Sequence, residues 1–136
     1  MTADPQPSSP DPLARQAATA IAVVRVGIGI GAVAFTRPGL KLLGFTEPDG
    51  MSVALARLAG GRDVALGVQG LLVRGDRGRL RQSSLLAAAV DAGDAGAFAA
   101  ALLRRDGIDR TALLNLPVAA SAAALGVWVA ARLRGT

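Results

Sequence analysis

Six charged side chains lie inside apolar stretches of this 136-residue chain, and they are its clearest candidates for chemistry. Three are carboxylates and three are guanidiniums: Asp63, Asp91 and Asp94, and Arg25, Arg57 and Arg62. Two carboxylates that lie close together differ in proton affinity, so one can act as a general acid while its neighbour stays ionised beside an arginine. We therefore predict that the three aspartates are catalytic, with a proton on Asp91 or Asp94 and with Asp63 kept ionised by Arg57 or Arg62.

The rest of the composition narrows the chemistry. The chain has no His, Cys or Tyr, which excludes a Ser-His-Asp triad, a thiolate nucleophile and cysteine metal sites. Three aspartates could bind Mg²⁺, but nothing in their spacing fixes an octahedral ligand set, so we predict neither a metal nor another cofactor. The side chains predicted to bind or orient a substrate are Arg25, Arg57, Arg62, Gln69 and Asn115.

Four apolar segments of membrane-spanning length carry these residues, at about 13–35, 51–73, 82–103 and 111–131. Apolar residues make up 51% of the chain and charged residues 18%, which is low for a soluble domain. We predict an all-α, integral membrane four-helix bundle over residues 13–136, preceded by a disordered tail at 1–12. The segment 40–45 is too short to span. It is expected either as an interfacial lid over one end of the bundle or as a loop with buried leucines.

The charged residues must pair if these segments cross a bilayer. Six unpaired charges near the midplane would cost roughly 15 to 20 kcal/mol, so we expect the helices to turn them toward one another. Small residues share a helical face with Arg25 and with Asp63, which allows close helix packing. Gly27 and Gly31 add a GxxxG spacing, expected as close packing inside the bundle or as a dimer face.

Basic residues outnumber acidic ones by 15 to 10, but the arginines are dispersed and aromatic residues are few, so nucleic-acid binding is not expected. Seven basic residues lie on the side of the spans that holds both chain ends and five on the other. The positive-inside rule then favours a multi-pass protein of the inner (plasma) membrane with both termini in the cytoplasm. The expected partners are membrane lipid, a lipophilic small molecule and further copies of the chain through Gly/Ala helix faces.

Three segments resemble the small four-helix bacterial membrane proteins of the DoxX-like families. They are residues 37–45 (RPGLKLLGF), 56–67 (ARLAGGRDVALG) and 90–95 (VDAGDA), and the similarity extends in layout over about 15–133. The resemblance implies a four-helix membrane bundle, in families that are mostly uncharacterised, with some members in membrane redox complexes. We do not carry over a redox role, because this chain has no His or Cys to hold haem or a metal.

Two interpretations of the charged centre remain open. It is either a self-satisfied network that fixes helix register, or the lining of a pocket for a lipophilic molecule. The second interpretation predicts a binding protein or a non-redox acid/base enzyme, such as a cyclase, an isomerase or an epoxide-opening enzyme. The alternative is a non-catalytic accessory subunit of a membrane complex. An ion-coupled transporter is the weaker third hypothesis.

Overall fold

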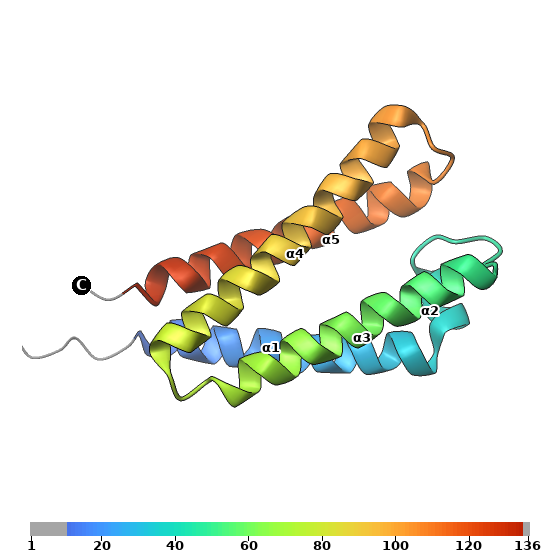
Figure 1. Ribbon diagram of the computed structural model, residues 1–136. Helices are drawn as coiled ribbons and strands as arrows, with labels where there is room; N and C mark the ends of the chain where they lie inside the picture. The colour runs from blue at the N-terminus through green and yellow to red at the C-terminus, as the bar shows by residue number, and fades with distance from the viewer. Residues whose placement is uncertain (1–10, 135–136) are drawn as a thin grey trace, which may run out of the picture.

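Five helices and no strand make up residues 11–134, the part of the chain that the computed structural model describes (Figure 1). The helices are α1 (Pro12–Ala34), α2 (Thr36–Leu42), α3 (Gly50–Leu72), α4 (Arg77–Arg104) and α5 (Asp109–Arg132). The all-α prediction is confirmed, and the four long helices coincide closely with the four predicted segments. Of the predicted tail, residues 1–10 lie outside the described part, and Pro12 already belongs to α1.

Three of the four long helices, α1, α3 and α4, begin at aspartate caps. Asp49 accepts hydrogen bonds from the backbone N–H and the hydroxyl of Ser52, and thereby caps α3. Asp76 accepts from the backbone N–H of Arg79, so α4 begins at Arg77. The basic segment 74–81 precedes the predicted apolar segment 82–103, yet it is helical from Arg77 onward, because Asp76 supplies the cap.

The long helices form two antiparallel pairs, α1 with α3 and α4 with α5 (Figure 1). Close approach in the first pair depends on glycine: a Cβ on Gly29 would lie 2.5 Å from the carbonyl oxygen of Gly60, and one on Gly67 would lie 2.6 Å from that of Ala22. A Cβ on Gly27 or on Gly31 would have nothing within 4 Å of it, so the expectation that these two glycines pack inside the bundle is wrong. They lie one step round the helix from the contact face, which contains Ala18, Ala22 and Gly29.

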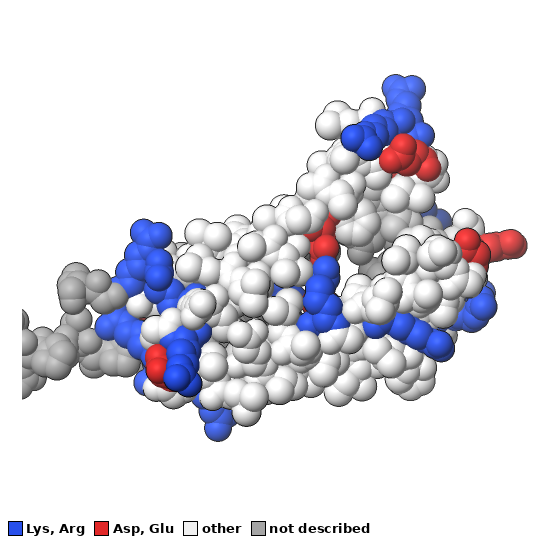
Figure 2. Space-filling view, in the orientation of Figure 1, with Lys and Arg blue, Asp and Glu red and all other residues white. Residues whose placement is uncertain are grey.

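The two pairs meet closely at the end that holds the chain termini. Buried Ala14, Ala18, Leu80, Val129 and Leu133 form an apolar core there. From the middle of the molecule, α3 and α4 diverge, and Figure 2 shows a hollow between them. At the far end the loop after α2 reaches α5, where Asn115 Nδ2 donates to the carbonyl of Leu43 at 3.3 Å. The short segment thus contributes both a helix with buried Leu40 and a loop that covers the start of α5.

Three of these helices, α1, α4 and α5, are long and apolar enough to cross a membrane. Helix α3 is of similar length but carries Arg57, Arg62 and Asp63, and it is not among them. Many large apolar side chains face outward along all four long helices, among them Ile28 at 60% exposure, Leu58 at 70% and Val118 at 67%. An outward apolar surface of this extent is typical of contact with lipid or with another protein.

Candidate functional site

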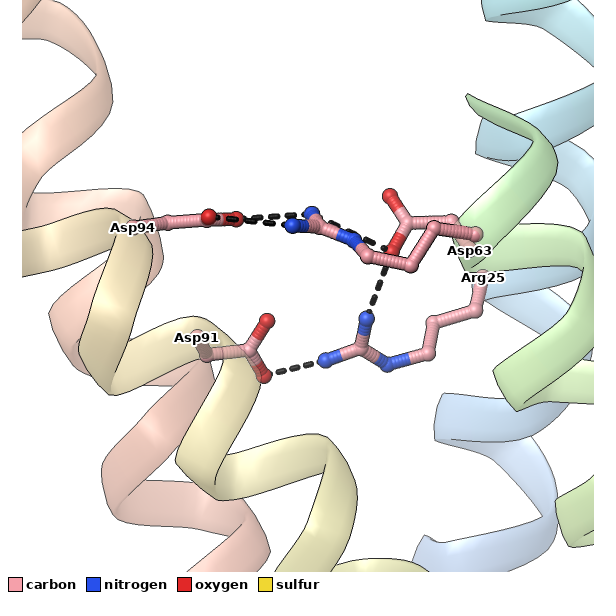
Figure 3. A network of polar contacts seen from close by, with 5 residues as sticks. Arg25, Asp63, Asp91 and Asp94 are labelled. Carbon is pink, nitrogen blue, oxygen red and sulfur yellow. Dashed lines mark hydrogen bonds and ion pairs between the residues drawn. The ribbon is translucent and has the colours of Figure 1, made fainter. Parts of the chain in front are cut away.

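Five of the six charged residues singled out in the sequence meet at the middle of the molecule (Figure 3). Arg25 Nη1 donates to Asp63 Oδ1 at 2.8 Å, and Arg25 Nη2 donates to Asp91 Oδ2. Arg62 makes a bidentate pair with Asp94, at 2.8 and 3.1 Å, and also lies 3.8 Å from Asp63. The expected pairing of opposite charges is confirmed, and we call these five residues the Arg/Asp cluster.

The cluster joins the two helix pairs. Arg25 comes from α1 and Arg62 and Asp63 from α3, whereas Asp91 and Asp94 come from α4, on which a three-residue spacing places them on one face. Both guanidiniums reach across to α4. These charge-assisted contacts therefore hold the pairs together just where α3 and α4 begin to diverge.

Exposure divides the cluster into an inner and an outer part. The side chains of Arg25 and Asp91 are only 11% and 10% exposed, and that of Asp63 is 20% exposed. Arg62 and Asp94 are 37% and 38% exposed. Acidic and basic atoms are visible at the edge of the hollow between α3 and α4 (Figure 2). The outer pair is thus the part that a molecule entering from this hollow would meet first.

The cluster has one more carboxylate than guanidinium, so with all five groups ionised its net charge is −1. The sequence had suggested a neutral set of three and three, because Arg57 was counted. That count is wrong: Arg57 is exposed, and its Nε donates to Thr36 Oγ1 at 3.3 Å. Arg57 lies five residues before Arg62 on α3. Five residues correspond to about 500° of rotation round the helix axis, which is more than one full turn, so the two side chains leave α3 in different directions. The side chain of Arg57 therefore reaches α2 and not the cluster.

Gln69 and Asn115, predicted to bind or orient a substrate, are not brought to the cluster. Gln69 is exposed on α3. Asn115 donates at 2.7 Å to the carbonyl of Thr111, one turn earlier in α5, in addition to its bond with Leu43. Asn115 therefore anchors the loop after α2.

Sequence reasoning missed two serines beside the cluster. A small, partly enclosed cavity of about 30 Å³ is lined by Arg25 and Asp91, by Ser83 and Ser84, and by apolar side chains that include Leu80 and Val129. Such a polar cavity has room for only one or two water molecules. Ser83 and Ser84 precede Asp91 by eight and seven residues, a helical repeat that could have identified them.

No three acidic side chains of residues 11–134 are grouped so as to hold a metal ion. No family model, curated protein or solved structure matches the chain. The resemblance to the DoxX-like families therefore stays a prediction, and the function must be argued from the cluster itself.

Proposed function

We propose that the chain is a multi-pass protein of the inner membrane, in which α1, α3, α4 and α5 cross the bilayer. The outward apolar side chains and the spanning length of α1, α4 and α5 support this proposal. Helix α3 is compatible with it because Arg62 and Asp63 turn toward α1 and α4, where their charges are paired. Both termini are assigned to the cytoplasm from the seven-to-five distribution of basic residues.

Within this membrane protein, the Arg/Asp cluster is proposed as an acid/base centre for a lipophilic small molecule. The observation that carries the proposal is the excess carboxylate: three carboxylates share two guanidiniums, and one proton makes the group neutral. A cluster kept only for stability has little reason to retain an extra buried charge, because buried ion pairs are weak sources of stability. Intramembrane ionisable groups commonly mark functional sites.

The roles follow from exposure and contacts. Asp94 is the carboxyl nearest the hollow and is the proposed proton donor and acceptor, with Arg62 fixing its orientation through two hydrogen bonds. Asp63 lies between two guanidiniums, 2.8 Å from Arg25 and 3.8 Å from Arg62, which fix its orientation. Asp91 borders the small cavity, which has room for water beside the cluster. Isomerisation, cyclisation and epoxide opening suit this centre. In each of these reactions a proton is given to the substrate at one step and recovered at a later one, and no redox partner is needed.

The apolar core argues against ion transport. Ala18, Leu80 and Val129 line the small cavity and also belong to the core that closes the terminal end of the molecule. A path from the hollow through the cluster therefore ends at packed apolar side chains. A closed end suits a binding or reaction site better than a route across the membrane.

Single substitutions test the proposal. Asp94→Asn and Arg62→Gln should keep the fold, because both side chains are more than one-third exposed, but should abolish turnover of compounds in a lipid extract. Asp106→Asn is the matched control: it makes the same chemical change in the exposed turn between α4 and α5. Folded variants with unchanged turnover would rule out the acid/base role, and a chain that stays monomeric in buffer without detergent would rule out the membrane assignment.

A non-catalytic accessory subunit is the second candidate function. It is favoured by the cavity beside Asp91, whose volume of about 30 Å³ is too small for a substrate. It is also favoured by the open space at Gly27 and Gly31, which suits close contact with another helix. A larger partner, or a second copy of the chain, would then cover the outward face of α1. This candidate predicts that Gly27→Leu abolishes co-purification of the partner while Asp94→Asn leaves it unchanged.

A further inference from the structure

The end of the molecule that holds the chain termini is strongly basic (Figure 2). Two acidic residues, Asp11 and Asp76, accompany seven arginines there, which gives a net charge of +5 over the described residues; the arginines are Arg15, Arg74, Arg77, Arg79, Arg81, Arg132 and Arg134. The described ion pairs at this end are Arg132 with Asp11 at 3.5 Å and Arg79 with Asp76 at 3.6 Å. At the opposite end, six basic residues, Arg57 included, accompany four acidic ones, for a net charge of +2.

Three of these arginines line an open pocket of about 380 Å³ between the start of α4 and the end of α5. Its lining consists of Arg77, Gly78, Arg81, Leu133 and Arg134. Arg77 is held in place by donating to the carbonyls of Leu133 at 3.0 Å and Arg134 at 2.9 Å. Arg81 forms no ion pair with the described residues, and its buried Nε has no hydrogen-bond partner among them. Among the described residues, none of the three guanidinium groups of this pocket pairs with a carboxylate. Guanidinium groups bind phosphate oxygens well.

Apolar side chains continue from this pocket toward the middle of the molecule. Leu85 follows Arg81 by four residues on α4, a spacing that returns to the same helical face. Val127, which is 54% exposed, lies in the last two turns of α5, before the pocket residue Leu133. A basic pocket with an apolar surface one or two turns below it matches the headgroup and the acyl chains of a phospholipid.

We infer that this pocket binds the phosphate of an anionic phospholipid headgroup in the leaflet that faces the chain termini. The inference rests on the proposed membrane insertion but not on the proposed chemistry of the Arg/Asp cluster. Attraction of clustered arginines to anionic lipid is a general electrostatic effect. The particular claim is that Arg81 and Arg134, together with the anchored Arg77, form one localised site.

The test uses the full chain in two kinds of vesicle, one of phosphatidylcholine alone and one that also contains phosphatidylglycerol. Lipids that remain bound are counted by native mass spectrometry after extraction. Wild type should retain phosphatidylglycerol in preference to phosphatidylcholine, and Arg81→Gln with Arg134→Gln should lower that preference about fivefold for each arginine removed. Arg104→Gln with Arg110→Gln, a matched pair of exposed residues at the opposite end, should retain it.

Three results would overturn the inference. The first is a wild type that inserts into both kinds of vesicle without lipid preference, and the second is an equal loss in the test and control pairs. The third is that inorganic phosphate displaces bound phosphatidylglycerol as effectively as added phosphatidylglycerol does. That result would assign the pocket to a free anion. Failure of wild type to insert into either vesicle would instead contradict the membrane assignment itself. Unchanged helical circular dichroism in the variants would confirm that lost binding is not lost folding.

Discussion

Arg25 is the residue on which the inner part of the cluster depends. Its guanidinium is 11% exposed and donates to both Asp63 and Asp91. Arg25→Gln would leave two poorly exposed carboxylates without this partner, and breaking a buried pair in this way costs about 3 to 5 kcal/mol. We expect a loss of that size in the free energy of unfolding, measured by denaturant titration in detergent micelles.

Arg62→Gln is the comparison for that measurement, because its partner Asp94 is 38% exposed. Exposed pairs contribute about 1 kcal/mol or less, so this variant should unfold close to wild type. If Arg25→Gln and Arg62→Gln lost the same free energy of unfolding, the inner and outer parts of the cluster would be equally buried in the folded protein, contrary to the structure.

Charge placement alone predicted most of the cluster. Arg25, Asp63, Asp91 and Asp94 lie near the middle of long apolar segments, where an unpaired charge is costly, and this requirement brought the right residues together. It did not distinguish Arg57 from Arg62. That choice depends on the rotation of α3 against α1, which the positions of Gly60 and Gly67 determine through backbone contact.

At the scale of helices, the contact between α1 and α3 should be intolerant of a single methyl group. A Cβ on Gly67 would lie 2.6 Å from the carbonyl oxygen of Ala22 and 3.0 Å from the backbone N of Val26, and backbone atoms cannot move aside as a side chain does. Gly67→Ala should therefore destabilise the protein by about 1 to 3 kcal/mol. Thermal unfolding in detergent would measure this loss.

Gly27→Ala is the control for that substitution. Nothing lies within 4 Å of a Cβ at Gly27, and alanine favours the helix over glycine by up to about 1 kcal/mol. This variant should be as stable as wild type or more so. A destabilised Gly27→Ala variant would show that this face of α1 is covered in the working protein, as the accessory-subunit hypothesis requires.

The start of α3 should depend on pH. Hydrogen bonds from the hydroxyl and the backbone N–H of Ser52 lower the pKa of Asp49 below its usual value. Because the pKa of Asp49 is lower in the folded than in the unfolded chain, the cap stabilises the helix fully at any pH above the unfolded-state pKa. This stabilisation is lost as the pH falls through the lower, folded-state pKa. Amide hydrogen exchange at Ser52 should accordingly gain protection between acidic and neutral pH.

Asp49→Asn is the control for this pH effect, because asparagine caps helices well and does not titrate over this range. Subtracting the pH profile of Asp49→Asn from that of wild type removes the contributions that the other carboxylates make to the hydrogen exchange at Ser52. Identical profiles for the two proteins would contradict the role of the ionised carboxylate.

Helix boundaries were largely predictable from apolar length and caps, and the exceptions have local causes. Helix α4 begins before the predicted apolar segment because Asp76 caps a turn rich in arginine, a turn that hydropathy alone assigns to a loop. Helix α2 forms directly after Phe35 although it contains Pro38 and Gly39, two residue types that favour turns. In both cases a short helical turn forms where composition favours a loop.

At the scale of the whole molecule, the division into two helix pairs was not predictable. Apolar faces occur on several sides of each long helix, so the sequence allows several arrangements of the helices, and the expected four-helix bundle is only one of them. The structure has close pairs joined by the terminal apolar core, by the Arg/Asp cluster and by the loop after α2. The hollow between α3 and α4 results from this arrangement.

The cluster should limit how far α3 and α4 separate. Because the chain has no cysteine, spin labels can be attached at Leu58→Cys on α3 and Leu103→Cys on α4, both exposed and toward the diverging ends. Replacing Arg62 with Gln removes the bidentate link to Asp94, so the distribution of label distances, measured by pulsed electron paramagnetic resonance, should broaden. Labels at Leu103→Cys and Leu113→Cys, within the α4–α5 pair, should keep their distribution. If the first distribution stays as narrow as the second, the apolar core, the loop after α2 and the remaining Arg25–Asp91 link hold the pairs together without the Arg62–Asp94 link.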